Sequence, residues 1–157
     1  MINPSPFSDA FGKHQRAKRM LRLRRDQVQA VVAHAWEAAP NECCGLIGGD
    51  ETGQAQNIYR LRNVNSNPET AYEAAPEELF AAQRQMRERN EHLLAIYHSH
   101  PRANTPTPSE TDVRLAYYPG AIYLIVGLAG EDAILRAFEI SEPEQSWHEV
   151  EYAILDE

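Results

Sequence analysis

The sequence predicts a mixed α/β domain with a largely antiparallel sheet and about three flanking helices. Three observations lead to this fold class. Segments with helix start and stop signals alternate with short apolar runs typical of strands. Neither repeats nor an internal linker interrupt the chain. At 157 residues, 43% of them hydrophobic, the chain has the length of one ordinary domain and enough apolar side chains for a core.

The charge distribution separates a short N-terminal segment from the rest. The first 25 residues hold seven basic residues and one acid, whereas the remainder holds eight basic and 22 acidic residues. Residues 1–19 also lack periodicity, so we expect a basic, flexible arm followed by a single domain over residues 20–157. The acidic body argues against a nucleic-acid surface.

Several locations and partners are disfavoured by the sequence. No apolar stretch approaches the roughly 18 residues that a membrane-spanning helix needs, so no membrane partner is expected. The N-terminus lacks the pattern of a secretory signal. The only cysteines, Cys43 and Cys44, are adjacent and cannot form a disulfide framework. A cytoplasmic location fits these features, and the sequence does not indicate an oligomeric state.

The first half of the chain is predicted to form a strand, a helix and two further strands, in that order. Residues 20–24 alternate apolar and basic side chains, which is typical of an edge strand. Asp26 is expected to cap a helix that Pro40 stops. Two apolar runs at 43–49 and 57–64, separated by a turn, are predicted to pair antiparallel.

The second half begins with a helix and ends in strands. Pro76 suits a first helical turn, and the helix is expected to reach about residue 90. A strand at 92–100 leads into a proline-rich loop. Ser109 is predicted to cap a third helix that ends near residues 119–120. Three further strands are expected at 121–128, 133–140 and 147–155.

The stretch "YHSHPRANTPTPSETD", residues 97–112, carries the chemistry. Side chains two apart on a strand share a face, so His98 and His100 can present two imidazoles side by side. A catalytic zinc takes about three protein ligands and leaves a fourth position for water, and Asp112 would be the third ligand. Prolines at three loop positions reduce the entropy lost in bringing Asp112 back to the histidines.

Each part of this pattern also fits a purely structural role. Two histidines separated by a single residue are common at half-exposed positions. Ser109 followed by Asp112 also fits a helix-capping box. The two interpretations are compatible, because a capped helix would hold Asp112 rigidly on its first turn. A zinc hydrolase further needs a base, and Glu42, just before the 43–49 strand, is the best placed carboxylate. Alternatively, Glu42 is an exposed loop acid.

"ECCGLIGG" at residues 42–49, followed by "HSHP…SETD", resembles the JAMM/MPN+ family of zinc metalloproteases, specifically its minimal prokaryotic members. The resemblance covers roughly residues 20–155. It implies a cytidine-deaminase-like α/β fold and one Zn²⁺ per chain bound by His98, His100 and Asp112. It also implies that Glu42 is the general base and that Ser109 stabilises the oxyanion. Eight residues separate His100 from Ser109, one more than the family's usual seven.

The resemblance also implies a substrate class. The family hydrolyses amide or isopeptide bonds that follow the Gly-Gly tail of ubiquitin or a ubiquitin-like protein. Only eight residues lie between Asp112 and the next expected strand, which leaves no room for the insertion that linkage-specific deubiquitinases of the family carry there. We therefore expect a peptidase or isopeptidase that releases cysteine or another adduct from a sulfur-carrier or ubiquitin-like protein.

Three different classes fit less well. A non-catalytic MPN scaffold, which mediates assembly, usually lacks the ligands that this chain retains. A zinc nucleobase deaminase needs an HxE and a PCxxC motif, and this chain has neither. A cupin-type metal protein would be all-β with a glutamate close after the histidines.

Overall fold

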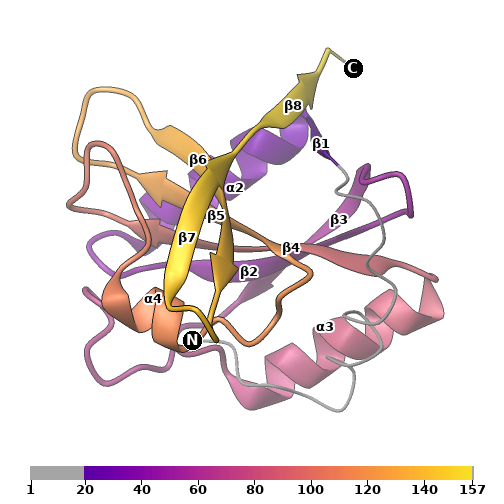
Figure 1. Ribbon diagram of the computed structural model, residues 1–157, viewed down its shortest axis with the longest axis horizontal. Coiled ribbons are helices and arrows are strands. Elements are labelled where there is room, and N and C mark those ends of the chain that lie inside the picture. The colour runs from indigo at the N-terminus through magenta and orange to yellow at the C-terminus, as the bar shows by residue number, and fades with distance from the viewer. Residues whose placement is uncertain (1–19, 157) are drawn as a thin grey trace.

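The computed structural model describes residues 20–156, which form eight strands and three helices. The six strands β2 to β7 form one twisted sheet, and α2 and α3 lie on opposite sides of it (Figure 1). In chain order the elements are β1 (Leu21–Arg24), α2 (Arg25–Ala38), β2 (Cys44–Gly49), β3 (Ala55–Leu61), α3 (Pro76–Glu88), β4 (His92–His100), α4 (Glu110–Arg114), β5 (Ile122–Gly127), β6 (Ile134–Ser141), β7 (Ser146–Val150) and β8 (Tyr152–Leu155).

The order of the large sheet is β3-β2-β4-β5-β6-β7. Every neighbouring pair is antiparallel except β4 and β5, which run parallel and are connected through α4. The predicted largely antiparallel α/β fold is confirmed. The histidine strand β4 lies inside the sheet, with β2 on one side and β5 on the other, so both of its edges are hydrogen-bonded.

Alternation along β2 and β4 divides the core into two clusters. Ile96 and Cys44 face the side of α3, where they join Leu79 and Met86. Tyr97 and its neighbours face the side of α2. Because successive side chains on a strand point to opposite faces, His98 falls on the α3 side together with Cys44, its direct cross-strand partner.

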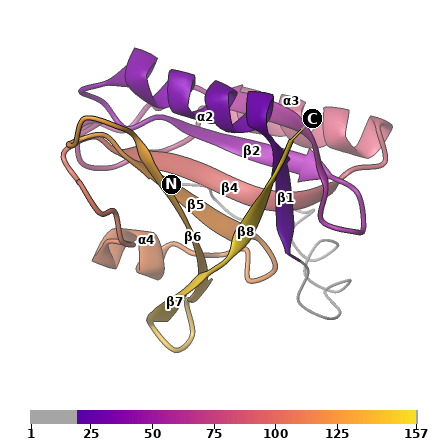
Figure 2. The same cartoon turned by 90° about the horizontal axis from the view of Figure 1, so that it is seen from above.

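The expected strand at 147–155 is in fact two strands in different sheets. β7 pairs with β6 at the edge of the large sheet, whereas β8 pairs in parallel with β1 in a two-stranded sheet (Figure 2). The break falls at Glu151, which is exposed and belongs to neither strand. Leu21 and Leu23 of β1 are buried beside α2, so this small sheet extends the α2 side of the core.

Two helix boundaries differ from the sequence prediction. Asp26 does not cap α2; the cap is Arg24, whose N–H donates to the Gln27 side chain at 2.8 Å, and Asp26 lies in the first turn. α4 ends at Arg114 rather than near residue 119. The chain turns there, which buries Ala116 and Tyr118 in the α3-side core. The predicted basic arm at 1–19 lies outside the described residues.

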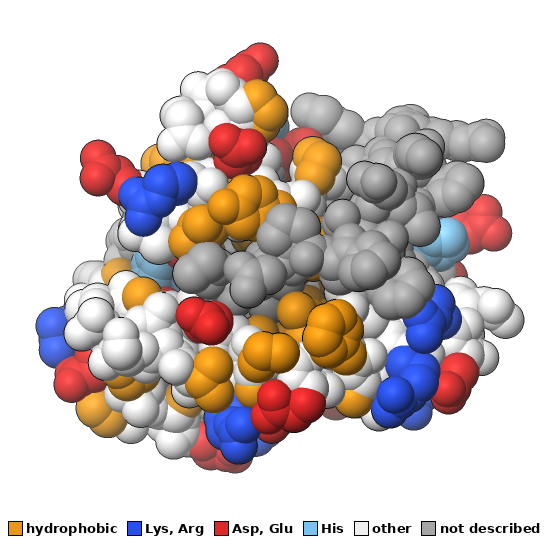
Figure 3. All heavy atoms as spheres, turned by 90° about the horizontal axis from the view of Figure 1, so that it is seen from below, with side chains coloured by type: hydrophobic (Ala, Val, Ile, Leu, Met, Phe, Trp, Pro, Cys, Tyr) orange, Lys and Arg blue, Asp and Glu red, His pale blue; other side chains and the backbone are white. Residues whose placement is uncertain are grey.

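In the described part of the chain, no helix combines the length and apolar character needed to cross a membrane. The face that carries α3 and α4 shows basic, acidic and apolar side chains mixed together (Figure 3).

Candidate metal centre

His98 and His100 present their imidazoles together at the carboxyl end of β4. They are two residues apart on one strand and therefore share a face, as the sequence predicts. Their Nε2 atoms are 3.1 Å apart. His98 is fully buried, and the side chain of His100 is 16% exposed, so the site opens to solvent on the His100 side.

Asp112 reaches the same point from α4. Its Oδ2 atom lies 3.1 Å from Nε2 of His98 and 3.1 Å from Nε2 of His100. Ser109 and Asp112 also form a reciprocal capping box: the Ser109 N–H donates to Asp112 Oδ2 at 2.9 Å, and the Asp112 N–H donates to Ser109 Oγ at 3.1 Å. The helix cap and the position of Asp112 beside the histidines are therefore compatible, because the capping hydrogen bonds fix the Asp112 carboxylate.

Three donor atoms at the corners of a triangle with 3.1 Å edges suit a metal ion. Tetrahedral zinc ligands at about 2.0–2.1 Å from the ion lie roughly 3.3 Å from one another, close to these spacings. Ligand atoms of Glu42, His98 and His100 also lie within 4.8 Å of one another and could hold an ion. We favour the triangle that includes Asp112, because its spacings are the tighter and match one coordination sphere.

Electrostatics favours the metal-binding form of Asp112 and of His98. Burial alone would raise the pKa of Asp112, but the charges and hydrogen bonds of the two histidines outweigh it and hold that pKa well below its usual range. Burial lowers the pKa of His98, which favours its neutral form. A carboxylate beside a neutral imidazole is the protonation state that metal ligation requires. Burial would lower the pKa of His100, but the hydrogen bond and the charge of Asp112 outweigh it and raise that pKa, so a bound metal ion would have to displace a proton there.

Glu42 approaches from the turn before β2. It is only 5% exposed, which contradicts the alternative of a solvent-exposed loop acid. Its backbone N–H donates to the carbonyl of Pro68 at 2.7 Å. Burial raises the pKa of Glu42 to about 7, with the charge of His100 opposing and that of Asp112 adding to the shift. A carboxyl group with this pKa can both take and give a proton near neutral pH.

Asn63 is a residue that the sequence analysis missed. It follows β3 and connects the Glu42 turn to residues 65–73. Its side-chain amide donates to the carbonyls of Glu42 and Ala71 at 3.0 Å and of Pro68 at 3.4 Å, and its side-chain oxygen accepts from the N–H groups of Asn65 and Glu73 at 3.0 Å. The only local signal is an asparagine-rich turn, "NVNSNP", which is typical of any loop.

The proline-rich loop between His100 and Ser109 is held against the ends of β5 and β6. The Ala103 carbonyl accepts from the Ala129 N–H at 3.0 Å, and the Arg136 guanidinium donates to the Pro106 carbonyl at 2.8 Å. A Cβ at Gly127 would lie 2.6 Å from the Ala103 oxygen, so the loop packs where only glycine leaves room. Tertiary contacts thus add to the stiffness expected from the prolines.

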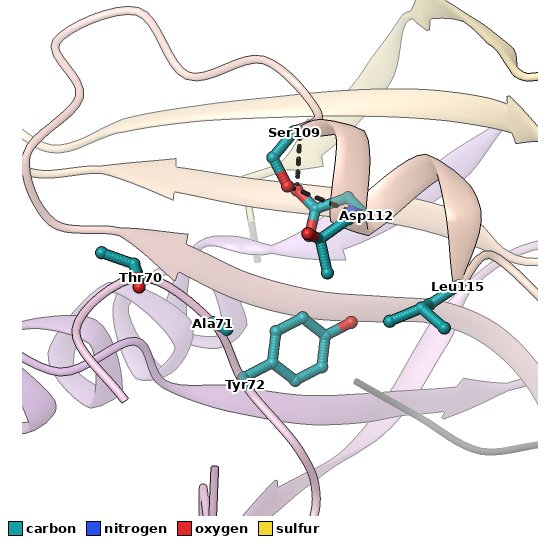
Figure 4. A pocket seen from close by; sticks show the side chains of 7 residues that line it. Thr70, Ala71, Tyr72, Ser109, Asp112 and Leu115 are labelled. Atoms are coloured by element: carbon teal, nitrogen blue, oxygen red, sulfur yellow. Dashed lines mark hydrogen bonds between the residues drawn. The ribbon is translucent and has the colours of Figure 1, made fainter. Parts of the chain in front are cut away.

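A pocket lies next to the donor triangle, between residues 70–72 and α4 (Figure 4). Its lining comprises Thr70, Ala71, Tyr72, Ser109, Thr111, Asp112 and Leu115. Tyr72, a second residue that the sequence analysis missed, stacks on the His98 ring with centroids 4.6 Å apart. Nothing in the local sequence distinguishes this tyrosine from an ordinary core residue.

The cysteines do not have the environment of a nucleophile. Cys43 and Cys44 are both buried and unpaired. Burial raises the pKa of Cys43 to about 11 and that of Cys44 to about 12, so both thiols stay protonated at neutral pH. The Cys44 thiol points to the Leu61 carbonyl at 3.6 Å. A thiol protease would need a thiolate beside a basic partner, and these residues do not supply one.

Comparison with known proteins places residues 24–141 in a family described as prokaryotic homologs of the JAB domain. A desampylase from Haloferax volcanii is 34% identical over 110 residues, which cover 67% of this chain and 78% of the relative. A CysO-cysteine peptidase from Mycobacterium tuberculosis is 37% identical over 108 residues, covering 68% of this chain and 73% of the relative.

A solved structure agrees with the fold. A protein from Desulfitobacterium hafniense, determined in solution, superposes with a TM-score of 0.76 at 33% sequence identity. The match covers 88% of this chain and 94% of that protein. The family match over residues 24–141 thus spans the strand and the helix that bring the donor triangle together.

Proposed function

The chain belongs to the family of prokaryotic JAB-domain proteins, and from this premise we propose that it is a zinc-dependent peptidase. Its substrate is the amide or isopeptide bond that follows the Gly-Gly tail of a ubiquitin-like or sulfur-carrier protein. The similar desampylase and CysO-cysteine peptidase, whose names denote cleavage of such conjugates, support this substrate class.

The observation that carries the proposal is the donor triangle of His98, His100 and Asp112, with edges of 3.1 Å. We assign these three residues as ligands of one zinc ion per chain. When bound, zinc supplies a Lewis acid that polarises the scissile carbonyl and lowers the pKa of a water molecule.

Glu42 and Ser109 supply the remaining chemistry in this proposal. Glu42 takes a proton from the attacking water and delivers it to the leaving amine as the C–N bond breaks. Burial of the Glu42 side chain, which raises its pKa in the metal-free protein, favours the uptake of that proton. The Ser109 oxygen accepts the Asp112 N–H, which leaves the hydroxyl hydrogen to be donated toward the carbonyl oxygen as negative charge develops there.

The pocket beside the triangle fits a thin tail. Its walls include the short side chains of Ala71 and Ser109. A tail of glycines, which carry no side chain, fits beside these residues more easily than a tail of bulky residues. We propose a cytoplasmic location, with which two buried, unpaired thiols are compatible.

The alternative of a non-catalytic scaffold explains less of the structure. A scaffold has no need for a buried Glu42 with a raised pKa next to two imidazoles and a carboxylate. Clusters of titratable groups with perturbed pKa values are typical of catalytic sites. The peptidase proposal accounts for each of these groups.

The test combines metal analysis with a cleavage assay. We expect purified protein to hold zinc and to cleave Gly-Gly-tailed adducts in a panel followed by mass spectrometry. Glu42→Gln should keep zinc and lose about 10²–10⁴-fold in kcat, because the amide cannot carry the proton. Glu110→Gln, which changes an exposed acid beside Ser109, is the matched control and should remain active.

Two results would contradict the proposal. Full zinc occupancy in the His98→Ala, His100→Ala double variant would remove the ligand assignment. Turnover of Glu42→Gln within a few-fold of the unmodified enzyme would mean that another group moves the proton.

A further inference from the structure

The buried ligand His98 lacks one expected contact. Its Nε2 atom faces the donor triangle, whereas its Nδ1 atom is buried without a hydrogen-bond partner among the described residues. A metal-bound histidine almost always donates its second N–H to a carboxylate, a carbonyl or water, which fixes the ring orientation. Among the described residues, no carbonyl or carboxylate supplies this contact to His98.

Tyr72 lies where it can hold the ring of His98 in place. Its ring stacks on the imidazole of His98 with centroids 4.6 Å apart and an angle of 29° between the planes. Tyr72 is 8% exposed and belongs to the α3-side core. This contact covers one face of the imidazole, and rotating the ring about its Cβ–Cγ bond would break the stack.

The backbone on both sides of Tyr72 is fixed. Asn63 donates to the carbonyl of Ala71 and accepts from the N–H of Glu73, each at 3.0 Å. The tyrosine ring is therefore mounted on a clamped segment rather than on a free loop. The Asn63 side chain also donates to the Glu42 carbonyl, so it fixes the backbone both at Glu42 and on either side of Tyr72.

We propose that Tyr72 is a positioning residue of the metal centre, whose ring holds the imidazole of His98 in the orientation for metal binding in place of a hydrogen bond at Nδ1. The inference rests on the proposed zinc site. It predicts that the aromatic face matters and that the hydroxyl does not. In the described structure that hydroxyl makes no hydrogen bond, and Figure 4 shows it pointing toward Leu115.

The test separates the ring from the hydroxyl. Tyr72→Phe keeps the aromatic face, whereas Tyr72→Leu and Tyr72→Met fill the space without one. We expect Tyr72→Phe to bind zinc within about twofold of the unmodified protein. The Leu and Met variants should lose about 10–100-fold in zinc affinity, the range measured when partners that orient metal ligands are removed. Affinity is measured by competition with a chromophoric chelator.

A spectroscopic readout distinguishes ring orientation from general stability. With cobalt in place of zinc, the visible absorption bands report coordination geometry, and they should change in Tyr72→Leu but not in Tyr72→Phe. Tyr123→Leu is the matched control. It removes a ring from the same core cluster, and Tyr123 stacks on neither histidine in the described structure.

The outcomes are distinct. Absence of zinc from the unmodified protein would refute the metal site itself. If the unmodified protein binds zinc and both aliphatic variants bind it equally well, the positioning role is refuted. Equal weakening in Tyr72→Phe or in Tyr123→Leu would also overturn it, since the aromatic face over His98 would then not be the cause.

Discussion

Replacing Asn63 with alanine tests how the Glu42 turn and the adjoining loop are held together. The change removes five hydrogen bonds to backbone groups of residues 42–73. Each is worth about 1 kcal/mol net, and water can replace some of them because Asn63 is only partly buried. We therefore expect a loss of about 3 kcal/mol in the free energy of unfolding. In a domain of this size that corresponds to a fall in Tm of about 6–12 °C.

The assay is urea unfolding of zinc-loaded protein, followed by circular dichroism. Asn67→Ala is the matched control, because Asn67 lies in the same loop and its side chain makes no hydrogen bond in the described structure. It should stay within about 0.5 kcal/mol of the unmodified protein. A loss below about 1 kcal/mol for Asn63→Ala, or an equal loss for Asn67→Ala, would refute the role of Asn63 as the link between these segments.

Three further predictions concern the α2 side of the large sheet and the thiols. Burial lowers the pKa of His34 from 6.5 to about 4, so its stabilising effect is complete above pH 6.5 and lost as the pH falls toward 4. For a partly exposed side chain we expect about 1–2 kcal/mol, and urea unfolding of metal-free His34→Gln should show a correspondingly weaker acid sensitivity; an unchanged pH slope would contradict this. Gly45→Ala should cost about 1–3 kcal/mol, because its Cβ would overlap the Tyr97 ring, and a smaller cost in a Tyr97→Leu background would identify that overlap as the cause. Cys44→Ser should keep zinc and most activity, while a strong chelator abolishes activity; an inactive, zinc-loaded Cys44→Ser protein would refute the metal mechanism.

The donor set could be anticipated from sequence because its geometry is local. His98 and His100 share a strand face by periodicity alone, and the spacing from Ser109 to Asp112 is that of a capping box. Each pattern specifies an orientation without knowledge of the rest of the fold. The convergence of the two patterns on one point was inferred from their combination, and the structure brings them within 3.1 Å.

The residues and boundaries that escaped prediction depend on distant partners. Asn63 and Tyr72 gain their roles from contacts with Glu42 and His98, which no periodicity records. The expected strand at 147–155 is divided because its first part, β7, pairs with β6, whereas its last part, β8, pairs with β1. A continuous apolar pattern identifies a strand, but not which neighbour will supply its hydrogen bonds.

The pairing of β1 with β8 has a consequence for synthesis on the ribosome. Among the described strands β1 pairs only with β8, with register partners from Tyr152 to Leu155, apart from an isolated bridge between Arg22 and Gln54. The apolar side chains of Leu21 and Leu23 are therefore made about 130 residues before the strand beside which they are buried. Contacts of such sequence separation form late and slow folding. The nascent chain must keep this short strand from pairing elsewhere until β8 has been translated, even though every residue of the metal centre has been made by then.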